Sequence, residues 1–420
     1  MSKSMCKSKS TVHYCSPAHG GWGIVRVGML VPESYQLFVS PFACGRHGAL
    51  GAVQQGTKNR LSYLFIDEAD IISGSYEDLI IDGVGELLNA LKEQPKVMFI
   101  GVSCLDDLLG TDHEALLSRL RKKYPMDFQM LQMNPISSDS KNPPSINIQR
   151  RIYGLIKTSE NKQDELNLIG NYVMLEDNHE LFEVLKEMGI NKVKHITMCA
   201  KYEDFQDMGN SKYNLVLRPE ARRAAEDMKL KNNIEYNFMP ISYDLDQIKK
   251  DYEDIKNMIA PNVELNLKQY EEKAILAINE AKKCINNLPI VIDHSSVCRP
   301  YSLAKALIQY GFNVESIYQE GLAEFEKESY EWLLQNAPQV KIYSAENHNM
   351  ILRNNTENKE RIAIGYNAGY MTEAKYVVDL VFDEKMFGYS GICLLMKKIM
   401  KAYLEPEELK KLINRYGLVI

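Results

Sequence analysis

The sequence predicts an α/β protein made of three doubly wound, parallel-sheet domains. Two observations support this fold class: short, almost wholly apolar runs alternate with longer amphipathic stretches, and glycine often separates the two. Short apolar runs are typical of strands buried on both faces of a parallel sheet, and amphipathic stretches are typical of helices that cover such a sheet. The length of 420 residues exceeds what one hydrophobic core supports and fits two to three domains.

The first domain is expected over residues 1–155. Within it, the apolar run at 96–102 predicts a strand buried inside a parallel sheet. The stretch 113–123 predicts a helix whose apolar face is formed by Ala115, Leu116, Leu117 and Leu120. The stretch 136–148 is rich in serine, proline and asparagine, and this composition predicts an exposed connection to the next domain.

Two later segments share one pattern, in which a strand leads to a helix that ends at a glycine. The strands are expected at 166–172 and 289–294, and the glycines are Gly189 and Gly311. Glycine adopts the left-handed conformation that commonly ends a helix, so a new strand is expected directly after each one. The pattern predicts a middle domain with a charged helical extension and a C-terminal domain, over residues 156–285 and 286–420. Further strands are expected at 193–198, 213–217, 234–239, 339–343 and 362–366.

Composition and charge argue against several classes of partner and location. Hydrophobic residues make up 45% of the chain and charged residues 25%, as in an ordinary soluble globular protein. The net charge of -6 and the lack of a basic stripe argue against a nucleic-acid partner. No run of 18 apolar residues occurs, so no membrane span is expected, and the polar start, Met1–Lys7, does not resemble a secretory signal. Eight cysteines without an export signal indicate reduced thiols and a cytoplasmic location.

Three cysteines in the first quarter of the chain, Cys15, Cys44 and Cys104, lie beside or near glycine or proline. Small residues let the backbone turn tightly and bring its amides near a bulky inorganic group, and thiolates are the usual ligands of iron–sulfur clusters. We therefore predict that the three cysteines bind such a cluster. Two alternatives stay open: buried free thiols, or a zinc site with His19 or His47 that lacks the paired spacing typical of zinc.

Other residues have weaker functional interpretations. Cys6 is expected in a flexible tail, and three cysteines are expected to be core or incidental residues, namely Cys199, Cys284 and Cys393. Cys298 follows a strand end, where open α/β sheets bind ligands, so it is either a cleft residue or a packed loop thiol. His294 is either a proton donor in the cleft or a hydrogen-bonded structural residue. Arg218 either binds a carboxylate or forms a surface salt bridge.

Several stretches of the chain resemble landmarks of the nitrogenase component 1-type proteins. The most specific are Cys15–Gly28, Pro41–Gly45 and Ser103–Asp112, and weaker ones are Asp70–Gly74, Leu168–Tyr172, Tyr213–Val216 and Arg299–Pro300. The family includes nitrogenase, its cofactor-assembly scaffolds, protochlorophyllide and chlorophyllide reductases, and the reductive cyclase of nickel-tetrapyrrole synthesis. The resemblance implies three Rossmann-like, doubly wound parallel-sheet domains around a central cleft.

The resemblance also implies a cofactor and partners. Cys15, Cys44 and Cys104 fall where subunits of the family present cluster cysteines, which implies a 4Fe-4S cluster or a larger, P-cluster-like one shared at a subunit interface. Three thiolates leave one iron of a cubane without a protein ligand, so a homodimer or a related sister subunit is expected to complete the site. The sequence contains no GxxxxGKS or GxxxxGKT phosphate loop, so an ATP-driven reaction needs a separate ATP-dependent iron–sulfur reductase, like the nitrogenase iron protein.

Two positions depart from the catalytic nitrogenase pattern. In catalytic subunits a cysteine and a histidine hold the large metal cofactor, whereas Arg218 and Phe387 stand near those positions here. The expected function is therefore an iron–sulfur oxidoreductase subunit that passes low-potential electrons from the reductase to a small-molecule substrate in the inter-domain cleft. A non-catalytic scaffold for metal-cofactor assembly is the alternative, and a binding protein without redox activity is a weaker third reading. The identity of the substrate stays open.

Overall fold

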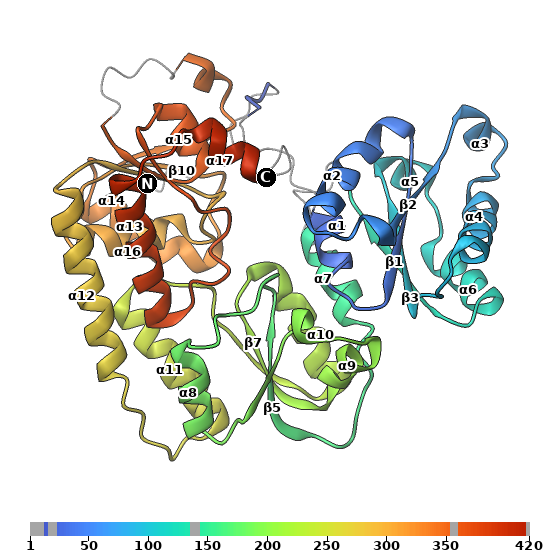
Figure 1. Ribbon diagram of the computed structural model, residues 1–420, viewed down its shortest axis with the longest axis horizontal. Coiled ribbons are helices and arrows are strands. Elements are labelled where there is room, and N and C mark those ends of the chain that lie inside the picture. The colour runs from blue at the N-terminus through green and yellow to red at the C-terminus, as the bar shows by residue number, and fades with distance from the viewer. Residues whose placement is uncertain (1–11, 16–22, 135–142, 353–359, 417–420) are drawn as a thin grey trace.

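The computed structural model describes residues 12–15, 23–134, 143–352 and 360–416 (Figure 1). It contains three parallel β-sheets of four, four and five strands with helices packed around them, so the predicted fold class is confirmed. In Figure 1 the first sheet lies on the right, the second at the bottom and the third at the upper left. Within these ranges, no helix combines the length and the apolar character that crossing a membrane requires.

The first sheet has the strand order β2-β1-β3-β4, and alternate residues of its strands point into two different cores. On one face Leu37 and Ile100 pack against helices α4 and α6, and on the other Phe38 and Phe99 face α1 and α7. The strands are β1 (Ser34–Ser40), β2 (Leu61–Phe65), β3 (Val97–Val102) and β4 (Asp127–Gln132). The helices are α1 (Gly23–Gly28), α2 (Arg46–Gln54), α3 (Glu68–Ile72), α4 (Tyr76–Ala90), α5 (Cys104–Leu109), α6 (His113–Lys123) and α7 (Pro144–Tyr153).

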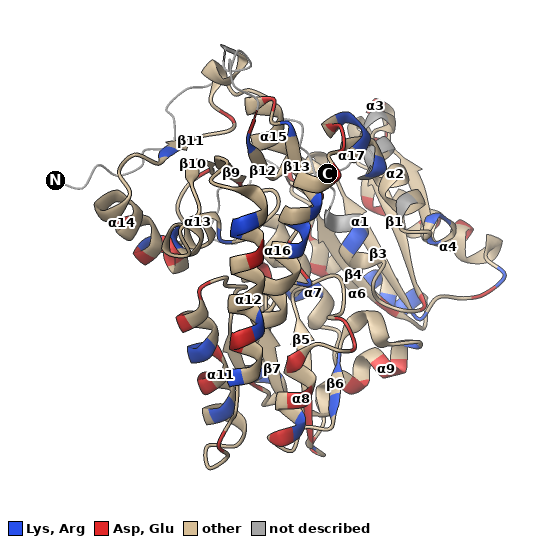
Figure 2. Ribbon diagram, turned by 60° about the vertical axis from the view of Figure 1, so that its left-hand side comes forward, with Lys and Arg blue, Asp and Glu red and all other residues tan. Residues whose placement is uncertain are grey.

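The second sheet has the order β6-β5-β7-β8 and lies between two hydrophobic cores. Ile169 and Val216 join the core shared with the first domain, and Leu168 and Leu215 join the core shared with the third. The strands are β5 (Gln163–Ile169), β6 (Lys192–Lys194), β7 (Ser211–Val216) and β8 (Glu235–Phe238). The helices are α8 (Glu180–Glu187), α9 (Tyr202–Gln206), α10 (Arg222–Asn232), α11 (Leu245–Ile259) and α12 (Lys268–Ile285). Figure 2 shows many lysine, arginine, aspartate and glutamate positions along the ribbons of α11 and α12, as expected for the helical extension.

The third sheet has the order β11-β10-β9-β12-β13. Ile292 and Ile364 face α13 and α16, whereas Val291 and Ala363 face α15 and α17, so this sheet also has helices on both faces. The strands are β9 (Ile290–Asp293), β10 (Val314–Tyr318), β11 (Lys341–Tyr343), β12 (Ile362–Ile364) and β13 (Tyr376–Val378). The helices are α13 (Pro300–Gln309), α14 (Lys327–Asn336), α15 (Tyr366–Thr372), α16 (Gly388–Leu404) and α17 (Leu409–Tyr416).

The glycine pattern identified in the sequence ends two helices as predicted. Gly189 and Gly311 have φ angles of 87° and 82°, which lie in the left-handed region. In each case the next residue donates its amide proton back to the helix, from Ile190 to Leu185 O (2.9 Å) and from Phe312 to Leu307 O (2.9 Å). Three expected strands run past their observed ends, because β5 ends at Ile169, β6 at Lys194 and β12 at Ile364. A 3-10 turn follows β6, and helix α15 begins two residues after β12.

Candidate functional site

The carboxyl edge of the first sheet brings Cys44 and Cys104 together. Cys44 lies in the 3-10 turn Phe42–Gly45 that follows β1, and Cys104 is the first residue of α5, which follows β3. Strands β1 and β3 are hydrogen-bonded neighbours, with Val39 opposite Val102, so the two loops leave the sheet side by side. Burial raises the pKa of the Cys44 thiol, and the nearby Cys104 raises it further. The two thiols are therefore within electrostatic range of each other.

Three aromatic side chains, Tyr63, Phe65 and Phe42, pack beside the turn that carries Cys44, and we call them the aromatic wall. The Tyr63 hydroxyl donates a hydrogen bond to the carbonyl of Gly45, and a Cβ atom at Gly45 would lie 2.8 Å from the Tyr63 ring. Tyr63 stacks on Phe65 with ring centroids 5.6 Å apart, and Phe65 contacts Phe42 at 5.0 Å. Because only glycine fits against the Tyr63 ring, the position of the Cys44 backbone is set by packing.

The surface around these cysteines is apolar and exposed. Phe42 is 79% exposed and Leu108, in the helix that Cys104 begins, is 74% exposed. Other exposed apolar side chains lie at or after the carboxyl ends of β1, β2 and β3, namely Leu50, Val53, Phe65, Ile72 and Leu109. Phe42 and Phe65 are in contact, and exposed apolar side chains that gather in this way are typical of an interface with another protein. We call Cys44, Cys104 and these exposed apolar side chains the cysteine edge.

Cys15 lies elsewhere in the structure. The Tyr14 amide donates to Glu346 O (2.8 Å), and His13 forms an isolated β-bridge with Asn347, so residues 13–15 are attached to the third domain. Cys15 is exposed, and the segment 16–22 that leads from it to α1 lies outside the described residues. Among the described residues, no group of three or more histidine, cysteine and acidic side chains is arranged to hold a metal. The structure thus brings two of the three predicted ligands together.

The alternative ligands and the other cysteines differ in position. Cys6 and His19 lie outside the described residues, as does the side chain of His47. Cys199 is half-buried near His195 O (3.5 Å), and burial raises the pKa of its thiol to about 11. Two further cysteines pack against the core between the second and third sheets, namely Cys284 and Cys393.

A cluster of charged side chains, Arg26, Arg218, Asp383 and Glu384, lies where the three domains meet, and we call it the junction. Arg218, which follows β7, donates to Asp383 Oδ1 at 3.0 Å, and Arg26 from α1 donates to Glu384 Oε2 at 2.9 Å. The Arg26 guanidinium also lies 4.4 Å from the centroid of the Tyr172 ring. Asp383 is fully buried and Glu384 is 4% exposed. One loop of the third domain is therefore held by one arginine from each of the other two domains.

At the junction, burial and ion pairing shift the pKa values of the acidic side chains in opposite directions. Burial raises the pKa of both Asp383 and Glu384, while Arg218 and Arg26 respectively pull those pKa values down. The Cys298 amide also donates to Asp383 Oδ2 at 3.1 Å, and burial raises the pKa of the Cys298 thiol well above its ordinary value. Cys298 thus lies near Arg218 at this junction.

Phe387 and His294 lie near the junction in different surroundings. Phe387 is 2% exposed, contacts the Tyr252 ring, and its carbonyl accepts a hydrogen bond from His179 Nε2 at 2.8 Å. It is therefore a core residue. The His294 amide donates to Tyr318 O at 3.1 Å, and its Nδ1 atom is buried without a hydrogen-bond partner among the described residues.

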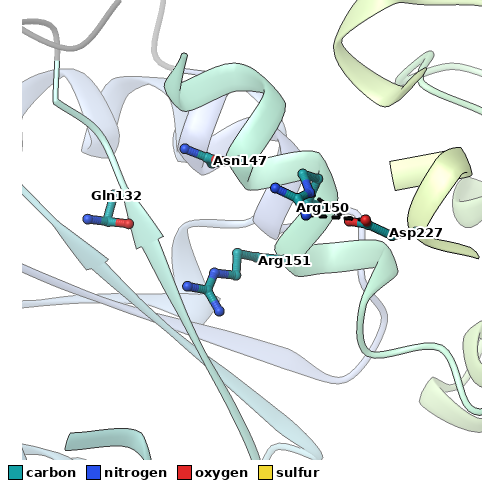
Figure 3. Close-up of a pocket in the computed structure, with 5 residues that line it drawn as sticks. All are labelled: Gln132, Asn147, Arg150, Arg151 and Asp227. Carbon is teal, nitrogen blue, oxygen red and sulfur yellow. Dashed lines mark hydrogen bonds and ion pairs between the residues drawn. The ribbon is translucent and has the colours of Figure 1, made fainter. Parts of the chain in front are cut away.

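A pocket of about 340 Å³ lies between the first and second domains (Figure 3). It is lined by Gln132 at the end of β4, by Asn147, Arg150 and Arg151 on α7, and by Asp227 on α10. Arg150 donates to Asp227 through Nε at 2.6 Å and through Nη2 at 3.2 Å, as the dashed lines in Figure 3 mark. This ion pair ties the two domains together beside the pocket.

Comparison with known proteins identifies the family. Residues 21–404 match the model of the nitrogenase component 1 type oxidoreductases. The chain belongs to this family. A curated relative, the nitrogenase iron-molybdenum cofactor biosynthesis protein NifE of Clostridium pasteurianum, is 23% identical over 194 residues. That match covers 44% of this chain and only 41% of the length of the relative.

Solved structures support the fold of this nitrogenase component 1-type protein over nearly its whole length. A structure described as nitrogenase Cp1 at pH 6.5 has a TM-score of 0.74 at 13% identity, covering 94% of each chain. A second, described as nitrogenase Cp1 at pH 5, has a TM-score of 0.61 at 14% identity, covering 93% of this chain and 89% of that one. At this level of identity, the similarity establishes a common fold.

The sequence did not reveal the acidic residues of the junction. Asp383 and Glu384 lie 165 and 358 positions from the arginines that they pair with, so no local pattern connects them. The signal that was available is an adjacent acidic pair in a segment of no regular secondary structure, between β13 and α16. Arg218 forms an ion pair with Asp383 inside the chain, and this pair is buried and not at the surface.

Proposed function

We propose that this chain is an iron–sulfur subunit of a nitrogenase-like two-component system. It receives low-potential electrons from a separate ATP-dependent reductase and passes them to a small-molecule substrate. The observation that carries this proposal is the pair Cys44 and Cys104 at an exposed apolar edge. In the proposed complex, that edge is covered by a second copy of the chain or by a sister subunit.

The residues of the cysteine edge fit part of a cluster site. Two half-buried thiols on adjacent loops can hold two irons. Cys15 is attached to the third domain, so we propose it as a third ligand only within the assembled complex. A 4Fe-4S cluster needs four ligands, so the partner must complete the set. Bound there, the cluster would supply reversible one-electron transfer at low potential.

In this proposal the chain's own residues position the turn that carries Cys44, exclude water from the cysteine edge and release the proton of the Cys44 thiol. Tyr63 fixes the Gly45 carbonyl and hence the turn that carries Cys44. Phe42 and Leu108 would exclude water once a partner covers them. Because burial raises the pKa of the Cys44 thiol, metal binding at neutral pH must release its proton.

The decisive experiment is anaerobic purification followed by iron and sulfide analysis and visible absorption spectroscopy. We expect a brown protein whose iron and visible absorbance are lost in Cys44→Ala and Cys104→Ala. The Cys284→Ala variant is the matched control, since this cysteine packs against the core between the second and third sheets and is far from Cys44 and Cys104 in the sequence. Wild-type iron content in both edge variants contradicts the assignment.

A scaffold for assembly of a metal cofactor is the second candidate. It is favoured by the relative named as a cofactor biosynthesis protein, and by Arg218 and Phe387 at positions near the expected cofactor ligands. A scaffold would release a bound metal precursor to another protein, whereas the oxidoreductase would show repeated, reductase-dependent substrate reduction. Transfer of iron without any turnover would favour the scaffold.

A further inference from the structure

We propose that Arg26 and Arg218 form a binding site for an organic dicarboxylate, and that Asp383 and Glu384 of the same chain occupy it as a displaceable internal plug. The site lies at the junction, outside the cysteine edge, and it does not depend on the cluster proposed above. The ligand class follows from the groups that the arginines hold in this structure, which are two carboxylates on consecutive residues.

The donors around Asp383 make a complete carboxylate-binding hole. Arg218 Nη1 donates to Oδ1 at 3.0 Å, while the Cys298 amide and the Tyr243 hydroxyl donate to Oδ2 at 3.1 and 3.3 Å. These donors come from the second domain, its extension and the third domain, and Arg218 is only 7% exposed. Charge-assisted hydrogen bonds from a guanidinium are the usual means of carboxylate recognition.

The second half of the site is less completely filled. Arg26 is held in place by aromatic rings, 4.4 Å from the Tyr172 centroid and 5.2 Å from the Phe382 centroid. It binds Glu384 through Oε2 alone, and the buried Oε1 atom has no hydrogen-bond partner among the described residues. A buried carboxylate oxygen without a donor is unfavourable. An external carboxylate that satisfies both of its oxygens would therefore have an advantage over Glu384 at this position.

The loop that carries the plug has features expected of a displaceable element. It connects β13 to α16 without regular secondary structure, and Phe382 has a φ of 99°, a conformation that is strained for any residue other than glycine. Phe382 is 38% exposed, and the following Lys385 forms an exposed ion pair with Glu176 at 2.7 Å. The strain at Phe382 and the exposure of Phe382 and Lys385 favour displacement of the short segment 382–385 alone, since Met386 and Phe387 after it are buried in the core.

The test measures binding of glutarate, with the neutral glutaramide as control, by calorimetry. We expect the plug variant, Asp383→Ala with Glu384→Ala, to bind glutarate roughly tenfold or more tightly than wild type, since no internal carboxylate competes. Adding Arg218→Gln to the plug variant should abolish binding, whereas Asp164→Ala, which removes an exposed acid paired with Lys212 at the start of β5, should leave wild-type behaviour unchanged. Should the plug variant unfold, glutarate and not glutaramide must restore its thermal transition.

A second readout uses the unaltered protein. Displacement of the loop by glutarate should accelerate tryptic cleavage after Lys385 several-fold, without changing cleavage at sites far from the junction. Lack of glutarate binding or rescue in the plug variant, or equal effects of glutarate and glutaramide, overturns the proposal. So does unchanged cleavage after Lys385 at glutarate concentrations that saturate the wild-type protein by calorimetry. Neither result bears on the iron content of the cysteine variants.

Discussion

The cysteine edge and the junction hold functional groups in opposite ways. At the edge, Cys44 and Cys104 are half-buried on two short loops, surrounded by apolar side chains that face solvent. At the junction, Asp383 and Glu384 are buried and each is paired with an arginine from another domain. The cysteines at the edge thus need further ligands from another subunit in the proposed complex, whereas the charged groups at the junction are already paired within the chain. A substitution should therefore affect assembly at the first region and folding at the second.

The largest expected effect is at the junction. Arg218→Met leaves the buried carboxylate of Asp383 without its cation, which should destabilise the fold by about 3–5 kcal/mol. Lys385→Met removes an ion pair whose side chains are 42% and 61% exposed, and should cost at most about 1 kcal/mol. Urea unfolding followed by circular dichroism compares the two, and equal costs would contradict the difference that we describe.

A smaller effect is expected for the turn that carries Cys44. Gly45→Ala places a Cβ atom 2.8 Å from the Tyr63 ring, and such overpacking typically costs about 1–3 kcal/mol. Iron binding should fall as well, because the turn must shift. Gly51→Ala is the matched control, since the space around its Cβ is free within 4 Å and alanine favours a helix. If Gly45→Ala matched Gly51→Ala in both stability and iron, the aromatic wall would not position Cys44.

A third expectation concerns pH and two further buried acids, Asp251 and Glu326. Burial raises the pKa of Asp251 from 3.8 to about 7 and that of Glu326 from 4.5 to about 7. Because the folded state holds these protons more tightly, the stability that they contribute is fully present below about pH 4. It is lost as the pH rises through about 7.

The corresponding experiment measures unfolding free energies between pH 5 and pH 8. One pKa unit corresponds to about 1.4 kcal/mol, so the decline should amount to a few kcal/mol at most. Asp251→Asn should flatten the curve, because the amide does not titrate. A curve of unchanged shape in this variant would show that Asp251 does not govern the decline.

The smallest effect on stability is expected from polar substitution of the exposed edge. Phe42→Ser and Leu108→Ser replace side chains that are 79% and 74% exposed, so each should change stability by about 0.5 kcal/mol or less. Self-association or binding of a sister subunit should weaken, since the apolar contact is reduced. Sedimentation velocity measures this, and unaltered association of the double variant would place the interface elsewhere.

Much of the fold could be predicted because periodicity and helix-ending glycines are local signals. The strand at 96–102 and the helix at 113–123 were found within one residue of their ends. Strand β1 was missed because Ser34, Gln36 and Ser40 interrupt its apolar residues, although all three are buried in the structure. Polar residues that are buried inside a sheet cannot be distinguished from loop residues by composition alone.

The candidate site was predictable only where strand ends determine it. Cys44 and Cys104 follow neighbouring parallel strands, so their loops converge once the sheet order is known. Cys15 is held instead by backbone hydrogen bonds to residues 346 and 347, a contact across most of the chain that leaves no mark in the local sequence. The pairing of Arg26 with Glu384 is of the same long-range kind.

Iron K-edge X-ray absorption of the anaerobically purified protein tests the central claim most directly. We predict iron–sulfur scattering in the wild type and in Cys284→Ala, and its loss in the double variant Cys44→Ala with Cys104→Ala. Iron–sulfur scattering of full amplitude in that double variant would contradict the account, as would a wild-type protein that binds no iron after anaerobic reconstitution with iron and sulfide.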